Sequence, residues 1–434
     1  MSTSEYRRRR DHLMAMMTPG SIAVVPSANG QIRNRDTEHP FRQNSDFYYL
    51  TGFEEPHALL VLAPGREHGE VIMFCREHDA RAERYDGERL GPERAAQVLG
   101  VDDAFPIGDI ADILPGLLEG RDRTYVTLGE FPDFDRQLLG WVKNIRSREA
   151  SGAVPPGEFI SLSHLLHDLR LYKSAAEQKA MRRAAQITVG AHVRAMRAAR
   201  PGLAEAHLEA ELLHEFMING ARFPAYPSIV AAGKNACVMH YIRNDASLND
   251  GDLVLIDAGC EYQYYASDVT RTFPANGRYS GAQREVYEVV LAAQTEALQV
   301  AVPGSAFNAP HDAAVKVMVD GLLALGLLEG EAGELIETEA YLRFCVHKSS
   351  HWLGLDVHDV GDYKVGEVWR ELEPGMVLTI EPGVYLPDEE DIPMVYRGMG
   401  VRIEDDVLIT RSGHEVLTAA APKTIDEVEA VMND

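Results

Sequence analysis

The hydrophobic pattern divides the chain into a region of short alternating elements and a later region dominated by long helices. Residues 5–17 have helical spacing, and the break at Pro19-Gly20 predicts the end of that helix. Strand and helix signals then alternate up to about residue 150, which indicates an α/β domain with a mixed sheet. The short apolar runs that predict strands are SIAVVPS, FYYLTGF, HALLVLA and VIMFC.

A Gly/Pro-rich connector at residues 151–159 precedes the helix-rich region. Ser174 and Glu177 have the spacing of a capping box and predict the start of a long helix. We expect an α+β domain with an antiparallel sheet, because helices come first and strands dominate the last third. The boundary near residue 172 gives domains 1–172 and 173–434. The predicted helices are 175–200, 204–220, 281–301 and 308–327, and MVLTIEPGVY and VRIEDDVLIT are the predicted late strands.

The stretch LVLIDAGCEYQYYASDVTRTF, residues 253–273, is predicted to form an antiparallel hairpin. A turn centred between Tyr262 and Gln263 would put Asp257 directly opposite Asp268, with their Cβ atoms ~5 Å apart. Two buried carboxylates this close need either a shared proton or a bound cation. We favour the cation. A lone pair of strand carboxylates is more often solvated, so this hypothesis depends on further ligand-type residues.

Three such residues lie near the predicted late strands: His351, Glu381 and Glu404. Together with Asp257 and Asp268 they make four carboxylates and one imidazole, a set that suits two divalent ions. Oxygen-rich ligation without thiolate fits manganese, with cobalt, zinc or iron as alternatives.

Three more histidines accompany this set: His240, His347 and His358. Imidazoles that bind no metal can donate protons or hydrogen bonds to a substrate and to a developing oxyanion. His358 has an equally good structural interpretation as a turn histidine bonded to Asp356 or Asp359.

Composition excludes some classes of function. The chain has 42 basic and 67 acidic residues and a net charge of −25, which argues against nucleic-acid binding. Four scattered cysteines are typical of a reduced cytoplasmic protein. No run approaches the ~18 apolar residues of a membrane helix, and no apolar segment of a signal peptide follows the basic N-terminus.

The motifs resemble those of the pita-bread metallopeptidases, and of their aminopeptidase P branch most closely. The resemblance rests on RQNSDFYYLTGFEEP and GERLG in the first region and on GDLVLIDAGCEYQYYASDVTRTF, SHWLGLDVHDVG, LEPGMVLTIEPGVY and GVRIEDDVLIT in the second. It implies the pita-bread (creatinase/aminopeptidase) fold with a curved antiparallel sheet. It also implies a dinuclear site, usually manganese, and release of an N-terminal residue that precedes proline. A homodimer or homotetramer is implied too, with the N-terminal domain restricting the active site and making oligomer contacts.

The resemblance also assigns roles to individual residues. The metal ligands would be Asp257, Asp268, His351, Glu381 and Glu404. His240, His347 and His358 match substrate-side histidines, and Arg402 and Tyr385 match positions near the metal aspartates. In the mechanism that we hypothesise, Glu381 accepts a proton, His358 stabilises the oxyanion, His240 orients the scissile amide and His347 packs near the proline ring.

The chain departs from the family pattern in two places. Lys348 stands where a small residue is common, and Tyr85-Asp86 occupies a region where close relatives often have tryptophan. Both departures concern substrate side-chain preference and leave the metal ligands intact.

Several alternatives share this fold. A prolidase, which cleaves Xaa-Pro dipeptides, would use the same metal ligands. A methionine aminopeptidase would not need a first domain of ~170 residues. A binding protein on an inactive peptidase fold and a creatine-type amidinohydrolase would both have lost metal ligands, and all five are present here.

Overall fold

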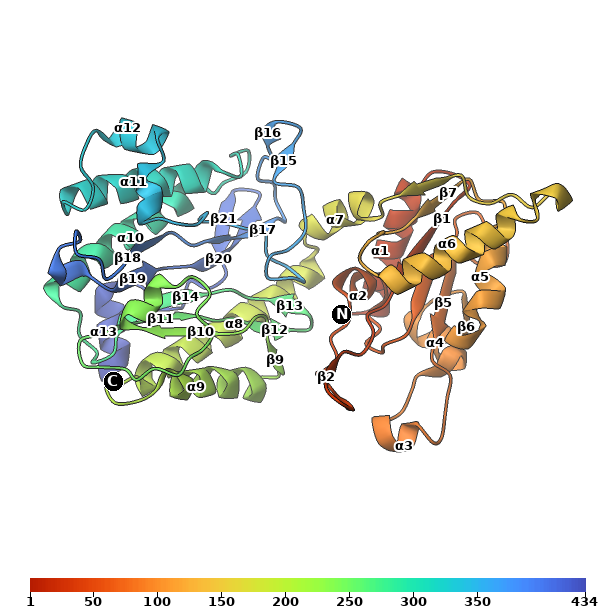
Figure 1. Cartoon of the computed structure of the whole chain (residues 1–434), viewed down its shortest axis with the longest axis horizontal. Coiled ribbons are helices and arrows are strands. Elements are labelled where there is room, and N and C mark those ends of the chain that lie inside the picture. The colour runs from red at the N-terminus through yellow and green to blue at the C-terminus, as the bar shows by residue number, and fades with distance from the viewer. The chain divides into compact units, whose positions relative to one another are not determined.

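The computed structural model describes all 434 residues, which form two compact units, Met1–Arg170 and Leu171–Asp434 (Figure 1). None of its helices is both long enough and apolar enough to cross a bilayer.

The first unit is built on a mixed sheet of six strands in the order β6-β5-β4-β1-β7-β8, which confirms the predicted α/β class. The central strands are mostly apolar and almost completely buried, so helices must cover both faces. The strands are β1 (Ser21–Pro26), β4 (Leu59–Leu62), β5 (Val71–Cys75), β6 (Asp103–Pro106), β7 (Arg123–Tyr125) and β8 (Glu158–Ile160), with a separate pair β2 (Ile32–Asn34) and β3 (Thr37–Glu38). The helices are α1 (Thr3–Met16), α2 (Ser45–Thr51), α3 (Glu83–Asp86), α4 (Gly91–Leu99), α5 (Ile110–Leu118), α6 (Pro132–Arg146) and α7 (Ser163–Leu171).

The strand predicted for FYYLTGF is wrong, because most of this segment lies in helix α2. The Asn44 side chain caps the helix by accepting a hydrogen bond from the Phe47 N–H, and Gly52 ends it with φ +64°. Aromatic residues favour strands on average, but a good N-cap and a left-handed glycine at the C-terminus outweigh that preference here.

The second unit is α+β, as predicted. In the view of Figure 1, most of its strands lie between one pair of helices, α8 (Ala175–Ala198) with α9 (Glu205–Ile218), and another, α10 (Gly281–Val300) with α11 (Ala309–Ala324). The predicted capping box is present: the Ser174 side chain accepts from the Glu177 N–H, and the Glu177 side chain accepts from the Ser174 N–H. Short helices α12 (Ala332–Glu337) and α13 (Ile425–Asn433) complete the helical set.

The strands of this unit form antiparallel ladders that are interrupted at several points. The first group comprises β9 (Phe223–Pro224), β10 (Ile229–Ala232), β11 (Leu253–Asp257), β12 (Cys260–Tyr262), β13 (Tyr265–Ala266) and β14 (Thr270–Pro274). The second comprises β17 (Val377–Ile380), β18 (Gly383–Leu386), β19 (Met399–Arg402), β20 (Asp405–Thr410) and β21 (Gly413–Val416), and β15 (Lys364–Val365) pairs with β16 (Val368–Trp369).

The predicted aspartate hairpin forms, but its register differs from the prediction. The turn is centred one residue later, on Gln263 and Tyr264, which both have positive φ as a tight two-residue hairpin turn requires. Asp257 is therefore paired with Thr270 and not with Asp268. Moving the turn centre by one residue moves each pairing partner by two positions. Each side chain therefore stays on its expected face of the sheet, and Asp257 and Asp268 are diagonal neighbours on one face.

The two predicted late strands pair with each other, and each is interrupted in the middle. Ile380 pairs with Asp405, and Gly383 pairs with Arg402 in the same register, so the ladder stops and resumes. Glu381 and Glu404 lie at this break. It frees both glutamate main chains for contacts with other segments.

Candidate metal centre and substrate cavity

A cavity of about 650 Å³ lies within the second unit. Its wall includes almost every site residue expected from the sequence, and only Tyr385 lies behind it. The lining residues are Tyr226, Pro227, Ile229, Met239, His240, Ile242, Asp257, Asp268, His347, Lys348, Ser350, His351, Val357, His358, Tyr363, Glu381, Arg402 and Glu404.

Asp257 and Asp268 converge on one hydroxyl group. Tyr226 donates to Asp257 Oδ1 at 2.6 Å and also contacts Asp268 Oδ1. Asp257 ends β11, and Asp268 lies just before β14, so the hairpin delivers both carboxylates to the same place. Burial and the two carboxylates raise the pKa of Tyr226 well above its usual value, so the hydroxyl stays a donor.

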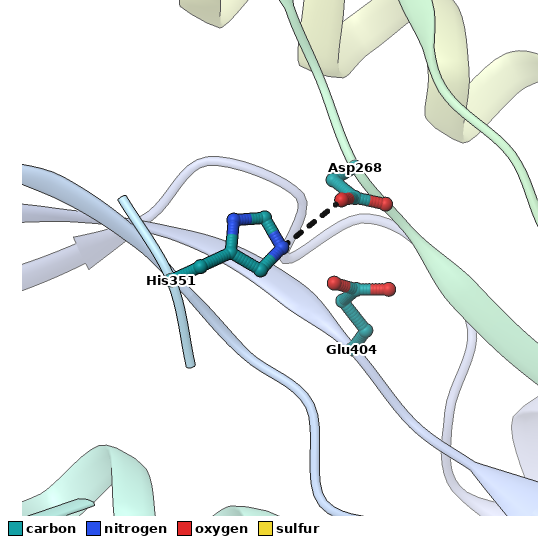
Figure 2. A group of neighbouring side chains, drawn as sticks. All are labelled: Asp268, His351 and Glu404. Carbon is teal, nitrogen blue, oxygen red and sulfur yellow. Dashed lines mark ion pairs between the residues drawn. The ribbon is translucent and has the colours of Figure 1, made fainter. Parts of the chain in front are cut away.

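Asp268, His351 and Glu404 form a compact cluster, whose ligand atoms all lie within 4.8 Å of one another (Figure 2). His351 Nε2 is 3.4 Å from Asp268 Oδ2 and 3.3 Å from Glu381 Oε1. The other ring nitrogen, Nδ1, donates to the Trp352 carbonyl at 2.9 Å. This hydrogen bond leaves Nε2 as the nitrogen that faces the carboxylates.

Too many anions meet here for the positive charge available. Burial and repulsion from neighbouring carboxylates raise the pKa of Glu381 to about 7 and that of Glu404 well above its usual range. Burial disfavours a charged ring at His351, but the hydrogen bond and charge of Asp268 and the charge of Glu381 outweigh it and raise its pKa to about 9. The electrostatics therefore favour additional positive charge at this point.

Arg402 supplies part of that positive charge. Its guanidinium contacts Asp257 Oδ2 and donates to the Thr270 hydroxyl at 3.0 Å and to the Tyr385 hydroxyl at 2.8 Å. Thr270 in turn donates to Glu404 Oε2 at 2.6 Å. One arginine thus holds carboxylates from both ladders in a fixed arrangement.

A hydrogen-bonded chain continues from Arg402 to His347. Nδ1 of His347 donates to the Lys348 carbonyl at 2.8 Å, and burial lowers the pKa of His347 to about 4, so the ring is neutral. Its Nε2 is then the acceptor for the Tyr385 hydroxyl at 2.7 Å. This chain fixes the tautomer and orientation of His347 at the cavity wall.

The other two substrate-side histidines are exposed in the cavity wall. The His358 ring packs edge-on against His351, with ring centroids 4.4 Å apart. Its side chain makes no hydrogen bond to Asp356 or Asp359, so the alternative of a satisfied turn histidine does not describe it. Burial and the charge of His351 lower the pKa of His358.

Comparison with known proteins identifies the family of the chain. The model of metallopeptidase family M24 matches residues 179–411, and that of the aminopeptidase P N-terminal domain matches residues 6–126. The chain belongs to metallopeptidase family M24. It is 46% identical over 433 residues to the Xaa-Pro aminopeptidase of Escherichia coli, covering 100% of this chain and 98% of that relative.

Solved structures of the M24 family have the same fold. A Pseudomonas aeruginosa aminopeptidase, PepP, is 58% identical with a TM-score of 0.99, covering 100% of this chain and 98% of that one. A zinc-substituted Escherichia coli aminopeptidase P in complex with product is 45% identical with a TM-score of 0.97 and the same coverage. These matches confirm the α/β plus pita-bread fold class predicted from the sequence.

The residues present fit the divalent ions of an M24 metallopeptidase. Two buried carboxylates, two half-buried carboxylates and one imidazole nitrogen face a common space. Carboxylate oxygens with imidazole are the donors that suit Mn²⁺, Co²⁺, Zn²⁺ and Fe²⁺. With Arg402 as the neighbouring cation, burial and mutual repulsion still raise the pKa values of Asp257, Glu381 and Glu404, which a divalent cation would reverse. The pKa of Asp268 is instead lowered, chiefly by its hydrogen bond to His351.

Sequence reasoning missed three residues of this M24 site. Tyr226 bridges the two aspartates, Thr270 bonds Glu404, and the Asp406 carboxylate accepts from the Asp268 N–H at 3.0 Å and from the Ser267 hydroxyl. Thr270 shares strand parity with Asp268, and Asp406 with Glu404, so a pairing register could have found them. Tyr226 lies far from the hairpin in sequence and carried no comparable signal.

Proposed function

We propose that this M24 chain is a metal-dependent exopeptidase that releases the N-terminal residue from peptides with proline at the second position. The observation that carries the proposal is the convergence of Asp257, Asp268, His351, Glu381 and Glu404 on one cavity. Two relatives that are 45–46% identical over 99–100% of this chain are Xaa-Pro aminopeptidases, which supports this activity and substrate class.

Two divalent ions, which we propose to be Mn²⁺, would be held by these five residues. When bound, such ions act as Lewis acids and lower the pKa of water to near 7. The chain's own residues must then orient the peptide and move protons.

Glu381 is the proposed proton acceptor. Its carboxylate faces His351, and its pKa of about 7 before metal binding lies in the range in which a general base works well. Thr379 donates to Glu381 Oε1 at 3.1 Å and holds this carboxylate toward the cavity.

The histidines are assigned to the substrate. His358, beside His351, is proposed to donate a hydrogen bond to the developing oxyanion, and His240 to orient the scissile amide. His347, held by Tyr385, is proposed to pack near the proline ring. Arg402 is proposed to keep the metal-site carboxylates in position.

Selection of proline has to come from pocket shape. The nitrogen of the scissile bond belongs to proline and has no hydrogen, so the enzyme cannot recognise proline through a hydrogen bond from this nitrogen. The cavity provides apolar surface from Ile229, Met239, Ile242 and Val357 for a ring of this size.

A prolidase remains the second candidate, since it would use the same metal ligands. A direct test compares turnover of a tripeptide such as Arg-Pro-Pro with turnover of the dipeptide Gly-Pro, after removal of metal and after addition of Mn²⁺, with metal content measured in parallel. We expect metal-dependent release of arginine and slow dipeptide cleavage. Preferred dipeptide cleavage would make the chain a prolidase, and full activity after exhaustive chelation would contradict both functions.

Three further properties belong to this proposal. We propose that the chain is cytoplasmic, a compartment supported by four free cysteines, three of them buried. We also propose a homodimer or homotetramer. In it, domain 1–172 would restrict access to the active site of domain 173–434 and contribute oligomer contacts.

A further inference from the structure

Lys173 and Asp359 form a buried ion pair outside the metal site. Asp359 directly follows His358 in the sequence. Lys173 Nζ donates to Asp359 Oδ2 at 2.9 Å, and each side chain is only 1% exposed. Two charges taken out of water are retained only where their geometry and further hydrogen bonds compensate the lost hydration. This pair therefore calls for an explanation of its own.

The ion pair joins two segments of the main chain. On the lysine side, the Lys173 N–H donates to the Gly375 carbonyl at 2.8 Å, just before β17. On the aspartate side, the Asp359 N–H donates to the Trp352 carbonyl at 2.9 Å, and Asp359 Oδ1 accepts from the Asp356 N–H at 3.4 Å. The turn at residues 352–359 is thus closed on itself and anchored to the lysine.

Gly354 leaves the space that the ion pair occupies. A Cβ at this position would lie 2.0 Å from Asp359 Oδ2 and 2.9 Å from Lys173 Cε. The Gly354 carbonyl also accepts from the Ala266 N–H at 2.8 Å, which ties the turn to β13. The local sequence is therefore shaped around the buried pair.

His358, the residue directly before Asp359, has no hydrogen bond or ion pair of its own. Its ring contacts His351 edge-on and is otherwise exposed to the cavity. The position of this ring consequently depends on the main chain of the turn, and the ion pair is one of the contacts that hold this turn in place.

We infer that Lys173 and Asp359 are positioning residues that hold His358 at the cavity wall. The inference rests on the proposed function, in which His358 faces the developing oxyanion. Neither side chain lines the cavity, so their effect passes through the main chain. A displacement of about 1 Å in such a group can lower the rate about 100-fold.

The test compares Lys173→Met, Asp359→Asn and the double variant with the wild-type, metal-loaded enzyme. Asp362→Asn, which removes an exposed carboxylate three residues further along, is the matched control. We expect Asp359→Asn and the double variant each to lose about 10- to 100-fold in kcat, with KM and metal content unchanged. The double variant should recover much of the melting temperature lost by the single variants, because no charge remains buried alone, while its kcat stays low. Recovery of kcat along with stability would overturn the inference, since the pair would then be structural only.

A second measurement does not depend on turnover. In the zinc-loaded protein, the imidazole NMR signals of His358, assigned by their loss in His358→Asn, should shift in Asp359→Asn and remain in place in Asp362→Asn. Unchanged signals would contradict the positioning role even in an active enzyme. If the wild-type protein cleaves no Xaa-Pro peptide but the His358 signals still shift in Asp359→Asn, the proposed function is refuted and the positioning role stands.

Discussion

Glu381 lies opposite Glu404 at the break between two antiparallel ladders that share one register. Because neither residue is in a ladder, the Glu381 N–H donates to the Ser349 carbonyl at 2.9 Å and the Glu404 N–H to the Thr270 carbonyl at 3.1 Å. Each glutamate is thereby joined to the segment that carries another proposed ligand, His351 or Asp268. The interruption of the sheet is what brings carboxylates from separate ladders to one cavity.

Replacing Glu381 by Gln should remove most activity without unfolding the protein. The amide keeps the size of the side chain but cannot accept a proton, so kcat should fall by about 10²- to 10⁴-fold. Steady-state kinetics on an Xaa-Pro tripeptide and metal analysis check this. Glu367→Gln, at an exposed position between β15 and β16, is the matched control and should behave as wild type. Near wild-type turnover in Glu381→Gln would remove the proposed role.

Replacing Tyr226 by Phe should destabilise the metal-free protein more than the metal-loaded protein. Loss of the hydroxyl leaves Asp257 and Asp268 buried side by side without their common donor, a change that costs about 1–3 kcal/mol. A bound cation compensates the same carboxylates. Thermal melts with and without Mn²⁺ should therefore show a larger metal-induced gain than in wild type. Equal melting temperatures of the two metal-free proteins would contradict the prediction.

Replacing Gly259 by Ala should disrupt the aspartate hairpin. An added Cβ would lie 1.6 Å from the main-chain carbonyl oxygen of Ser267, on the other arm of the hairpin, and no side-chain rotation can relieve that contact. We expect a loss of more than about 4 kcal/mol or failure to fold, as for other severe clashes. Gly281→Ala is the control, since nothing lies within 4 Å of the added atom in the first turn of α10. Soluble, metal-binding Gly259→Ala protein would show that the ladder is more adaptable than the structure indicates.

His192 should make the stability of the second unit sensitive to acid. Its Nε2–H donates to the Ala258 carbonyl at 3.0 Å, Nδ1 is buried without a partner, and burial lowers the pKa from 6.5 to about 4. The unfolded chain takes up a proton below pH 6.5 and the native ring does not until about pH 4. This contribution to stability is therefore complete above pH 6.5 and falls by about 3 kcal/mol as the pH drops to 4.

The measurement for His192 is the urea midpoint of metal-free protein at pH 7.5 and pH 5. His192→Gln should lose less stability between these two conditions than wild type does. The exposed His214→Gln on α9 should keep the wild-type difference. An identical pH dependence in His192→Gln and wild type would assign the acid sensitivity to other groups.

Local patterns in the sequence were enough to predict most of the long helices. The capping box at Ser174 and Glu177 and the apolar spacing of the helices depend on residues a few positions apart, so they could be predicted with their bounds to within a few residues. Segment 47–53 could not, because its aromatic residues favour a strand and only the Asn44 cap and Gly52 make it helical. The hairpin register also failed, by one residue in the turn, because the positive φ of Gln263 and Tyr264 has no strong signature in those residue types.

The sequence alone therefore determined which residue types stand at the ends of apolar strands, and so the likeness to a metallopeptidase and its candidate ligands. Only the tertiary structure decided how they meet: the bridging hydroxyl of Tyr226, the interrupted ladders at Glu381 and Glu404, and the buried Lys173–Asp359 pair. The physical reason is distance along the chain. Propensity and periodicity act over a few residues, whereas these contacts join segments tens to hundreds of residues apart and exist only once the core has packed.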